Sequence, residues 1–258
     1  MNRGIRFKRL TFTKLPIYVI GYPKSGNTWL SRLLGDTLDS EMGGLPETTP
    51  ICTGGLDRKG AFKIMQLHIL PTYGGSDKNF IDVFDGKTLI NIDKRQDEAI
   101  IHIVRDPRDV VISSMYYWQM SDLMLVLKKL IHGGSPLYRV GWPYFVSSWL
   151  TIPNIVLIRY EDLINDTASS LNQLLHTLGL TPKCNLYETI NRQAIGNVKL
   201  DVQINESKYS YNKEIQLRHL RKGVVGDWKN HFKRKHIQLA REYFEDIMNG
   251  LGYTDWDI

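Results

Sequence analysis

The sequence contains very little cysteine: Cys52 and Cys184 are the only two in 258 residues. They lie far apart and outside any Cys-x-x-Cys or Cys/His cluster, which argues against a disulfide framework and against a zinc site. The chain also lacks an apolar run near the ~20 residues that a membrane-spanning helix needs. Its basic first residues lead into only a short apolar stretch, unlike those of a signal peptide. We therefore expect a cytoplasmic protein without a membrane anchor.

No compositional bias marks the chain as fibrous, disordered or disulfide-rich. Its 42% apolar and 23% charged residues are ordinary for a globular protein. The net charge of +6 and the pI near 9.1 favour an anionic ligand, but they do not choose among nucleotide, nucleic acid and membrane. The length allows one large domain or two small ones. Because neither an internal repeat nor a low-complexity linker divides the chain, we expect a single domain spanning 1–258.

Short apolar runs alternate with helical patterns along the chain. The expected buried strands are 16–21, 87–92, 99–104 and 154–160, and the expected helices are 27–39, 107–120, 142–151, 167–178 and 231–249. Strands that are apolar throughout and alternate with helices are typical of a parallel sheet covered on both faces. The predicted fold class is α/β: a single domain with a central parallel β-sheet flanked by helices and a P-loop-like strand-loop-helix nucleotide site.

Four segments rich in glycine, proline or polar residues are longer than a connection needs. They are about 40–60, 71–86, 118–141 and 196–222. Such segments are either plain surface loops or lids and walls of a binding pocket.

The segment GYPKSGNTW, residues 21–29, has the glycine spacing of a phosphate-binding loop. The Walker form places a lysine directly after its second glycine. Here Asn27 occupies that position, and the lysine is Lys24, inside the loop. A glycine loop between a strand and a helix directs backbone N–H groups at an anion. The pattern therefore predicts a phosphate site that differs from that of the Walker enzymes.

Two further segments are suited to anions. In IVRDPRDVVIS, Asp106 is a good N-cap, Pro107 suits the first helical position, and Asp109 resembles the second member of a capping box. Arg105 then stands at a strand tip, where α/β folds bind ligands, and suggests a second phosphate group rather than a metal. The segment RKGVVGDWKNHF, residues 221–232, combines cations with glycines. Alone it is a weak signal.

Together these segments resemble the cytosolic-type sulfotransferases, which use 3′-phosphoadenosine 5′-phosphosulfate (PAPS). YPKSGNTW is similar to that family's 5′-phosphosulfate loop and IVRDPRDVVIS to its 3′-phosphate segment. IRYEDL and RKGVVGDWKNHF match two further family segments in the expected order. The resemblance implies transfer of a sulfonate group, by in-line displacement, to a hydroxyl or N–H of a small-molecule acceptor. It also implies release of 3′-phosphoadenosine 5′-phosphate (PAP), with no metal required.

The resemblance also assigns roles to single residues. Lys24 would contact the oxygen that bridges sulfonate and 5′-phosphate. The 5′-phosphate would be held by Ser25, Gly26, Asn27, Thr28 and Trp29, of which Trp29 would also stack near the adenine in a pocket lined by Tyr160. The 3′-phosphate would be held by Arg105, Ser113, Arg221, Lys222 and Gly223.

The family places its catalytic base in a K-T-H segment, and the counterpart here is MQLHILP. His68 is therefore the candidate base, because a histidine with a pKa near ~6.5 can take the proton of an attacking hydroxyl. We expect His102 and His231 to be structural. Gln66 stands where the family has a lysine, and Ala194 and Ile195 replace a serine-phenylalanine pair at the adenine pocket.

The dimer motif of the family, K-x-x-x-T-V-x-x-x-E, would begin at Lys229 but is broken at Lys233, Arg234 and Gln238. We therefore expect a monomer or a different dimer, and no nucleic-acid or membrane partner. Asp77, Asp82 and Asp85 are either solvated or attract a cationic acceptor. Two other functions stay open from the residues alone. One is a magnesium-dependent P-loop nucleotide kinase or NTPase, and the other is a non-catalytic protein that binds nucleotide or nucleic acid.

Overall fold

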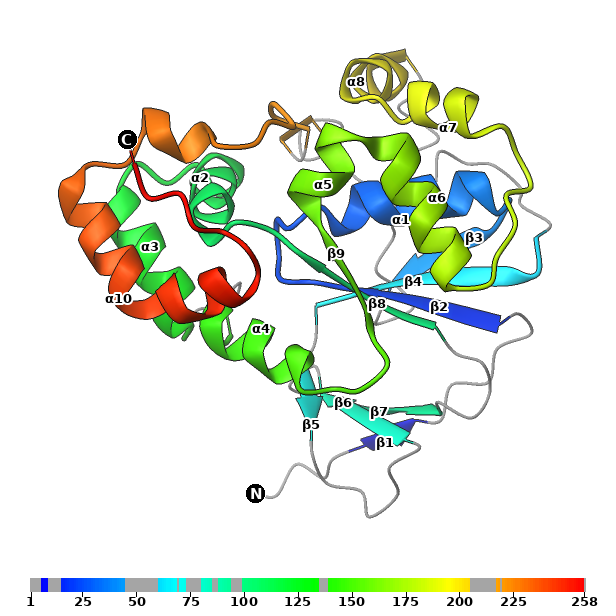
Figure 1. Ribbon diagram of the computed structural model, residues 1–258, viewed down its shortest axis with the longest axis horizontal. Coiled ribbons are helices and arrows are strands. Elements are labelled where there is room, and N and C mark those ends of the chain that lie inside the picture. The colour runs from blue at the N-terminus through cyan, green and yellow to red at the C-terminus, as the bar shows by residue number, and fades with distance from the viewer. Residues whose placement is uncertain are drawn as a thin grey trace.

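A five-stranded parallel sheet forms the centre of the molecule (Figure 1). The computed structural model describes residues 6–8, 15–44, 60–68, 70–72, 80–84, 88–93, 99–134, 139–204, 217–218 and 220–257. The strand order is β3 (Glu41–Gly44), β4 (Phe62–Leu67), β2 (Leu15–Ile20), β8 (Ala99–Val104) and β9 (Val156–Arg159). All four neighbouring pairs are parallel, which confirms the predicted α/β class.

Helices cover both faces of this sheet because successive side chains of a strand point to opposite sides. Ile17 and Val19 of β2 pack in one apolar cluster, whereas Tyr18 and Ile20 pack in the other. The first cluster includes side chains of α1 (Asn27–Thr37), α5 (Tyr160–Asn165) and α6 (Thr167–Thr177). The second includes side chains of α2 (Pro107–Tyr117), α3 (Leu123–His132), α4 (Trp142–Leu150) and α10 (Arg234–Gly250).

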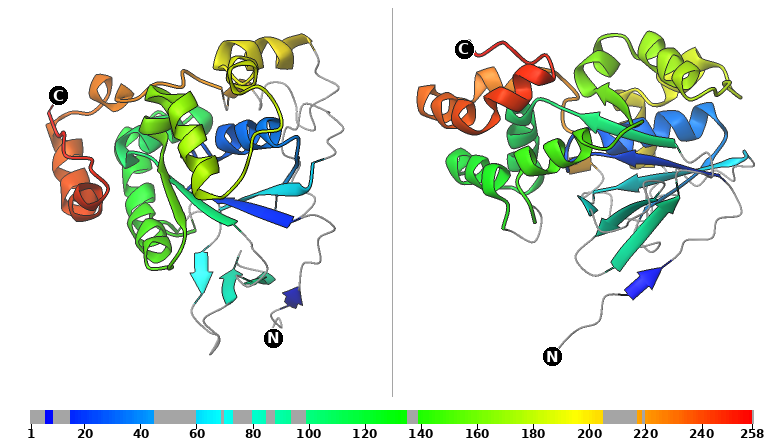
Figure 2. Two further views of the ribbon diagram at one scale, coloured as in Figure 1. Left: turned by 45° about the vertical axis from the view of Figure 1, so that its right-hand side comes forward. Right: turned by 60° about the horizontal axis from the view of Figure 1, so that its bottom comes forward.

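A second, four-stranded sheet lies beside the first (Figures 1 and 2). Its order is β1 (Arg6–Lys8), β7 (Thr88–Asp93), β6 (Phe80–Phe84) and β5 (Leu70–Thr72). The run 87–92, predicted as a strand of the parallel sheet, belongs here instead and pairs antiparallel with β6. β4 takes its place in the central sheet. That strand escaped prediction because Lys63 and Gln66 interrupt its apolar run.

Parts of the four predicted loops are regular elements. The segment 118–141 contains helix α3, which Asp122 caps by accepting a hydrogen bond from the Leu125 amide, and 196–222 begins within α8 (Ile195–Ile204). The segment 40–60 begins with β3, and 71–86 contains β6. Asp77, Asp85 and Cys52 lie outside the described residues, and Cys184 is a free, exposed cysteine.

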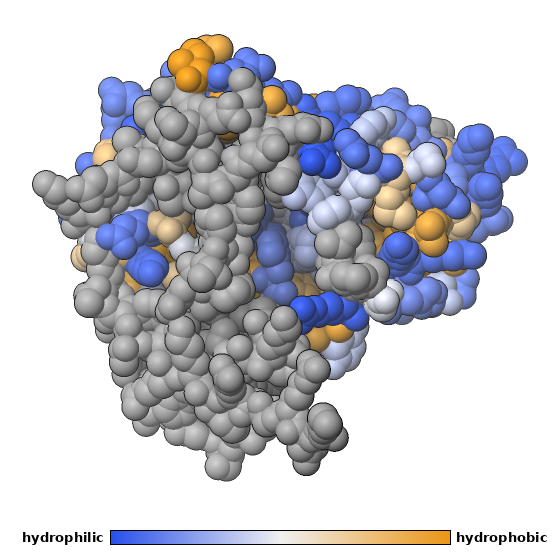
Figure 3. All heavy atoms as spheres, turned by 180° about the vertical axis from the view of Figure 1, so that it is seen from behind, coloured by the Kyte–Doolittle hydropathy of each residue, from blue (hydrophilic) through white to orange (hydrophobic). Residues whose placement is uncertain are grey.

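The remaining described helices are α7 (Leu186–Arg192) and the short 3-10 helix η3 (Asp227–Asn230). Figure 3 shows the molecule from behind, where an apolar cluster stands out at the top of the view, over the region of α8. Leu200 and Ile204 of that helix are exposed.

The C-terminal segment is fastened to the start of α2 through buried polar groups. The Tyr253 hydroxyl donates to Glu161 Oε2 at 2.5 Å, and the Asp106 amide donates to Glu161 Oε1 at 3.0 Å. The guanidinium of Arg108 donates to Asp106 and to the carbonyl of Asp255. Burial raises the pKa of Glu161, although the bonds from Tyr253 and Asp106 oppose that shift. A buried carboxylate therefore connects α5, the start of α2 and the last residues of the fold.

Replacing Tyr253 with phenylalanine is expected to lower the free energy of unfolding by about 1–3 kcal/mol, because Glu161 loses a donor in a buried setting. Urea denaturation measures this change. Tyr187→Phe is the control: that residue is 78% exposed, and its change should stay below about 0.5 kcal/mol. Equal losses in the two variants would contradict the proposed fastening.

Candidate active site

The glycine loop leaves β2 at Gly21 and enters α1 at Asn27, as predicted. Gly26 has φ 97°, and a Cβ there would meet the Tyr160 ring at 2.5 Å. A Cβ at Gly21 would lie 2.1 Å from Asn27 Oδ1. Lys24 also takes a left-handed conformation, with φ 72°, which is uncommon for a residue with a side chain. The loop therefore depends on both glycines for its close approach to neighbouring groups.

The start of α1 has the features of an anion cradle. No side chain caps this helix, and the buried Ser25 hydroxyl has no hydrogen-bond partner among the described residues. Buried polar groups normally have partners, so an orphaned donor beside a helix N-terminus fits a phosphate or sulfonate oxygen. Asn27, expected as a further donor, instead directs its Nδ2 to the carbonyls of Tyr22 at 3.0 Å and Gly21 at 3.4 Å.

Lys24 lies within the field of two arginines from distant segments. Its Nζ stands 3.9 Å from the centroid of the Tyr117 ring. Burial, followed by the charges of Arg105 and Arg221, lowers the pKa of Lys24 to about 7. Three cations predicted from three separate motifs therefore converge, and an anion between them would relieve their mutual repulsion.

Arg105 connects the glycine loop to the basic loop. It follows β8, and its guanidinium donates to the Lys24 carbonyl at 3.2 Å and to the Val224 carbonyl at 3.1 Å. The same guanidinium stands 4.3 Å from the centroid of the Tyr160 ring. Arg105 is buried, so its position is set by these contacts.

In the basic loop, the predicted cations pair with an acid. Arg221 Nη1 lies 2.6 Å and Lys222 Nζ 3.0 Å from the Asp227 carboxylate. Burial alone would raise the pKa of Asp227, but hydrogen bonds from Lys222, Arg221 and Asn230 hold it well below its usual value. Gly223 has φ 65°, and a Cβ there would lie 3.2 Å from Ile195 Cδ1.

Trp29 and Tyr160, the two aromatic residues predicted for the adenine pocket, lie next to each other. The rings of Trp29 and Tyr160 meet edge to face at 6.0 Å. Trp29 Nε1 donates to the Gln193 carbonyl at 3.1 Å, and the Gln193 side chain bonds Arg32 at 2.6 Å and Asp36 at 2.5 Å. Sequence reasoning missed Gln193; its only signal was its place directly before Ala194.

The register of β2 and β4 places His68 beside the glycine loop. Ile20 pairs with Leu67, so the next residues, Gly21 and His68, are neighbours. His68 Nδ1 lies 2.7 Å from the Gly21 carbonyl oxygen, and His68 Nε2 lies 3.2 Å from Gln66 Nε2. Nδ1 also lies 3.3 Å from Asn27 Nδ2, but its shorter contact is with the carbonyl. A carbonyl can only accept, so Nδ1 carries the hydrogen, and in the neutral ring Nε2 carries the lone pair.

The surroundings of His68 favour that neutral ring. Desolvation by the surrounding protein atoms lowers the pKa of His68; the bond to Gly21 opposes this, and the charge of Lys24 adds to it. The residue nevertheless keeps an exposed face. Its Nε2 is thus an unprotonated nitrogen with access to solvent, which is the chemical state that a general base needs.

The other predicted residues occupy the same elements. Thr28 lies half-buried in the first turn of α1 and Ser113 half-buried on α2. His102 is buried in β8, where desolvation lowers its pKa to about 4 despite a bond to the Ile20 carbonyl. His231 lies 3.5 Å from Asp227. The burial of His102 fits the structural role expected for it, and the structural role of His231 stays a prediction.

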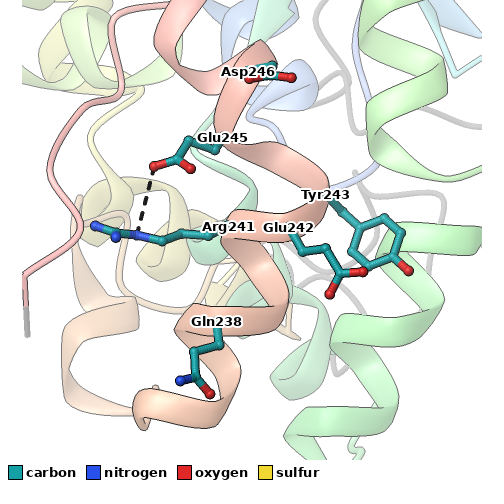
Figure 4. Close-up of a pocket in the computed structure, with 6 residues that line it drawn as sticks. All are labelled: Gln238, Arg241, Glu242, Tyr243, Glu245 and Asp246. Atoms are coloured by element: carbon teal, nitrogen blue, oxygen red, sulfur yellow. Dashed lines mark ion pairs between the residues drawn. The ribbon is translucent and has the colours of Figure 1, made fainter.

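One surface hollow is lined by none of the predicted site residues. Its lining comes entirely from α10: Gln238, Arg241, Glu242, Tyr243, Glu245 and Asp246 (Figure 4). Arg241 and Glu245 pair there at 3.9 Å. With three carboxylates and one guanidinium, this hollow does not suit an anion.

Within the described part of the chain, no cluster of three or more His, Cys, Asp or Glu could hold a metal, and no helix is long and apolar enough to cross a membrane.

A family model described as the sulfotransferase domain matches residues 93–252. The chain belongs to the sulfotransferase family. The match includes Arg105, Tyr160 and the basic loop, and it begins after the glycine loop and His68.

Two curated relatives of this family member show how far the similarity extends. Sulfotransferase 2A1 of Rattus norvegicus is 29% identical over 178 residues, covering 61% of this chain and 60% of the relative. The chain therefore matches about 60% of the length of that relative. A 3-alpha-hydroxysteroid sulfotransferase of Cavia porcellus is 24% identical over 270 residues, covering 90% and 83%.

Solved structures share the fold. Mouse sulfotransferase SULT7A1, complexed with PAP, superposes with a TM-score of 0.66 at 21% identity, covering 91% of this chain and 84% of that one. Retinol dehydratase in complex with androsterone and PAP superposes with a TM-score of 0.60 at 13% identity, covering 90% and 80%.

The lowered pKa of Lys24 has a consequence for stability. Between pH 7 and 10.5 the folded chain holds one proton fewer at Lys24 than the unfolded chain does. The contribution of Lys24 to the free energy of unfolding therefore rises with pH across that window, by up to about 1.4 kcal/mol per pH unit. Lys24→Met should remove this rise, measured by urea unfolding between pH 7 and 9.5. The exposed Lys183→Met is the control, and equal pH slopes in all three proteins would refute the lowered pKa.

Proposed function

We propose that this protein transfers a sulfonate group from PAPS to a hydroxyl or N–H of a small-molecule acceptor and releases PAP. The observation that carries the proposal is the convergence of Lys24, Arg105 and Arg221 around a glycine loop whose other flank presents His68. A Walker lysine is missing, because Asn27 occupies its place and spends its amide on the loop backbone. The site thus offers cations and backbone groups for two phosphates and a base for an acceptor.

The residues present fit the donor. The uncapped start of α1 and the orphaned Ser25 hydroxyl suit the 5′-phosphate, together with Gly26, Asn27, Thr28 and Trp29. Arg105, Ser113, Arg221, Lys222 and Gly223 would hold the 3′-phosphate. Arg221 and Lys222 pair with Asp227, so their charges are already oriented by a carboxylate before a phosphate arrives. Trp29 and Tyr160 would enclose the adenine.

When bound, the donor supplies a sulfur–oxygen bond that breaks with its electron pair remaining on the 5′-phosphate. His68 Nε2 takes the proton of the acceptor hydroxyl as the acceptor oxygen attacks sulfur. The Gly21 carbonyl keeps the other ring hydrogen in place and so orients the base. Lys24, in its protonated form, offsets the negative charge that develops on the leaving phosphate.

Gln66 gives the site a feature of its own. In place of the family lysine, it presents an amide nitrogen 3.2 Å from His68 Nε2. Because that ring nitrogen holds a lone pair, the amide is a donor to it. An acceptor hydroxyl must take over this position to give up its proton. Gln66 therefore contacts the base and leaves neutralisation of the leaving group to Lys24.

The acceptor proposed first for testing is an apolar alcohol. The relatives include a 3-alpha-hydroxysteroid sulfotransferase, and a structural neighbour is described in complex with androsterone. Phenols and amines are further members of the proposed class.

We also propose that the protein is cytoplasmic and acts without a metal, as a monomer or in a dimer unlike that of the family. Lys229, where the family dimer motif would begin, pairs with Asp255 at 2.7 Å.

Replacing His68 with asparagine tests the proposed base. Asparagine can still donate to the Gly21 carbonyl, but it offers no basic nitrogen, so kcat should fall by about 100-fold or more. Calorimetry should show PAP affinity within about threefold of that of the unmodified protein. His176→Asn, on the exposed face of α6, is the control and should keep full activity. Loss of PAP binding along with activity would point to a structural role for His68.

A pair of charge variants at Gln66 tests its contact with the base. Gln66→Glu should raise the pKa of His68 and Gln66→Lys should lower it, each by about one unit, because a neighbouring charge stabilises or opposes the imidazolium. A base must be unprotonated, so the acid limb of kcat/KM against pH should move up with glutamate and down with lysine. Shifts in the same direction, or none, would contradict the contact.

A further inference from the structure

Asp109 lies at the centre of the contacts between the two segments that carry the predicted 3′-phosphate ligands. It is the third residue of α2 and is 1% exposed. The sequence suggested a capping box, in which an acid bonds the backbone at the start of its own helix. The structure shows otherwise: the Asp109 carboxylate accepts from the amides of Gly226 at 2.7 Å and Trp228 at 3.0 Å.

Those two amides belong to the basic loop, which is more than a hundred residues away in the sequence. Asp106 caps α2 alone, by accepting from the Arg108 amide at 2.9 Å. Asp109 is therefore free to bind another segment. Gly226 has φ 78°, a conformation that favours glycine and turns its amide into the contact. Two charge-assisted hydrogen bonds from one carboxylate thus hold the turn between Val225 and Trp228.

Arg105 completes the same junction from the other side. Its Nη2 donates to the Val224 carbonyl and lies 3.8 Å from Asp109 Oδ2. The groups that face Asp109 are therefore the guanidinium of Arg105, on its own segment, and two backbone amides of the basic loop. The nearby carboxylate of Asp106 is occupied with Arg108. No other described side chain bonds both Gly226 and Trp228.

We propose that Asp109 is a positioning residue that gives the site its selectivity for a 3′-phosphorylated nucleotide. This inference rests on the proposed function. Asp109 holds the basic loop so that Arg221 and Lys222 reach the same phosphate as Arg105. An acceptor is needed at this point because the loop is attached through the backbone N–H groups of Gly226 and Trp228, and the Asp109 carboxylate supplies it. Asp109 reaches the glycine loop only indirectly, through Arg105, which donates to the Lys24 carbonyl.

The test compares two nucleotides that differ only in the 3′-phosphate: PAP and adenosine 5′-monophosphate. Asp109→Asn keeps the shape but turns one acceptor oxygen into a donor that opposes an amide. PAP affinity, measured by calorimetry, should fall by about tenfold or more, whereas that of the monophosphate should stay within about twofold. Asp166→Asn, a cap on α6 that accepts from Ser169 at 2.9 Å, is the matched control and should change neither affinity.

A second comparison separates positioning from a general loss of structure. Arg221→Ala should weaken PAP in the unmodified protein and add little in the Asp109→Asn background, because both changes act through one loop. Equal loss of both nucleotides, or full additivity of the two substitutions, would overturn the inference. If Asp109→Asn folds poorly, Asp109→Glu displaces the same oxygens by one methylene and should show the same selective loss.

The controls also separate this inference from the proposed function. Unmodified protein that binds PAP no better than the monophosphate would overturn the proposed donor site, and this inference with it. Unmodified protein that prefers PAP, with the preference unchanged in Asp109→Asn, would overturn the role of Asp109 alone.

Discussion

The bonds made by one buried guanidinium hold the site together. Arg105 stands at the end of β8 and reaches the Lys24 carbonyl in one direction and the Val224 carbonyl in the other. Its guanidinium also contacts the ring of Tyr160, the first residue of α5. A buried charge is costly without partners, so this arginine stabilises the fold only where loop carbonyls, an aromatic face and Asp109 surround it. Four segments are thereby brought to one edge of the central sheet.

That arrangement places like charges close together, and the chemistry follows from this. Burial is the main cause of the lowered pKa of Lys24, and repulsion from Arg105 and Arg221 adds to it. Folding supplies part of the compensation through Asp227 and Asp109, which pair with the arginines. The remainder suits an anionic ligand with two separated phosphates. The buried hydrogen bonds of Glu161 with the Asp106 amide and the Tyr253 hydroxyl hold the chain next to Arg105 in place.

Much of the architecture could be predicted from local pattern. The strands β2, β8 and β9, the helices α1 and α2 and the glycine loop between β2 and α1 follow from apolar runs, caps and glycine spacing. The position of β7 could not be, because an apolar run does not say which sheet it joins. The Asp109 bonds were mistaken for a local cap, since their partners lie in a distant segment. Likewise, the His68 contact with Gly21 depends on strand register, which no single segment encodes.

The measurement that tests the central claim most directly is calorimetric titration with PAP in the presence of EDTA, beside ATP with Mg²⁺. The account predicts that PAP binds tightly without metal and that Arg105→Ala weakens this binding by about tenfold or more, because the junction of the two loops loses its shared cation. Binding of ATP only with magnesium, and no binding of PAP, would contradict the account and return the glycine loop to the nucleotide kinases and NTPases.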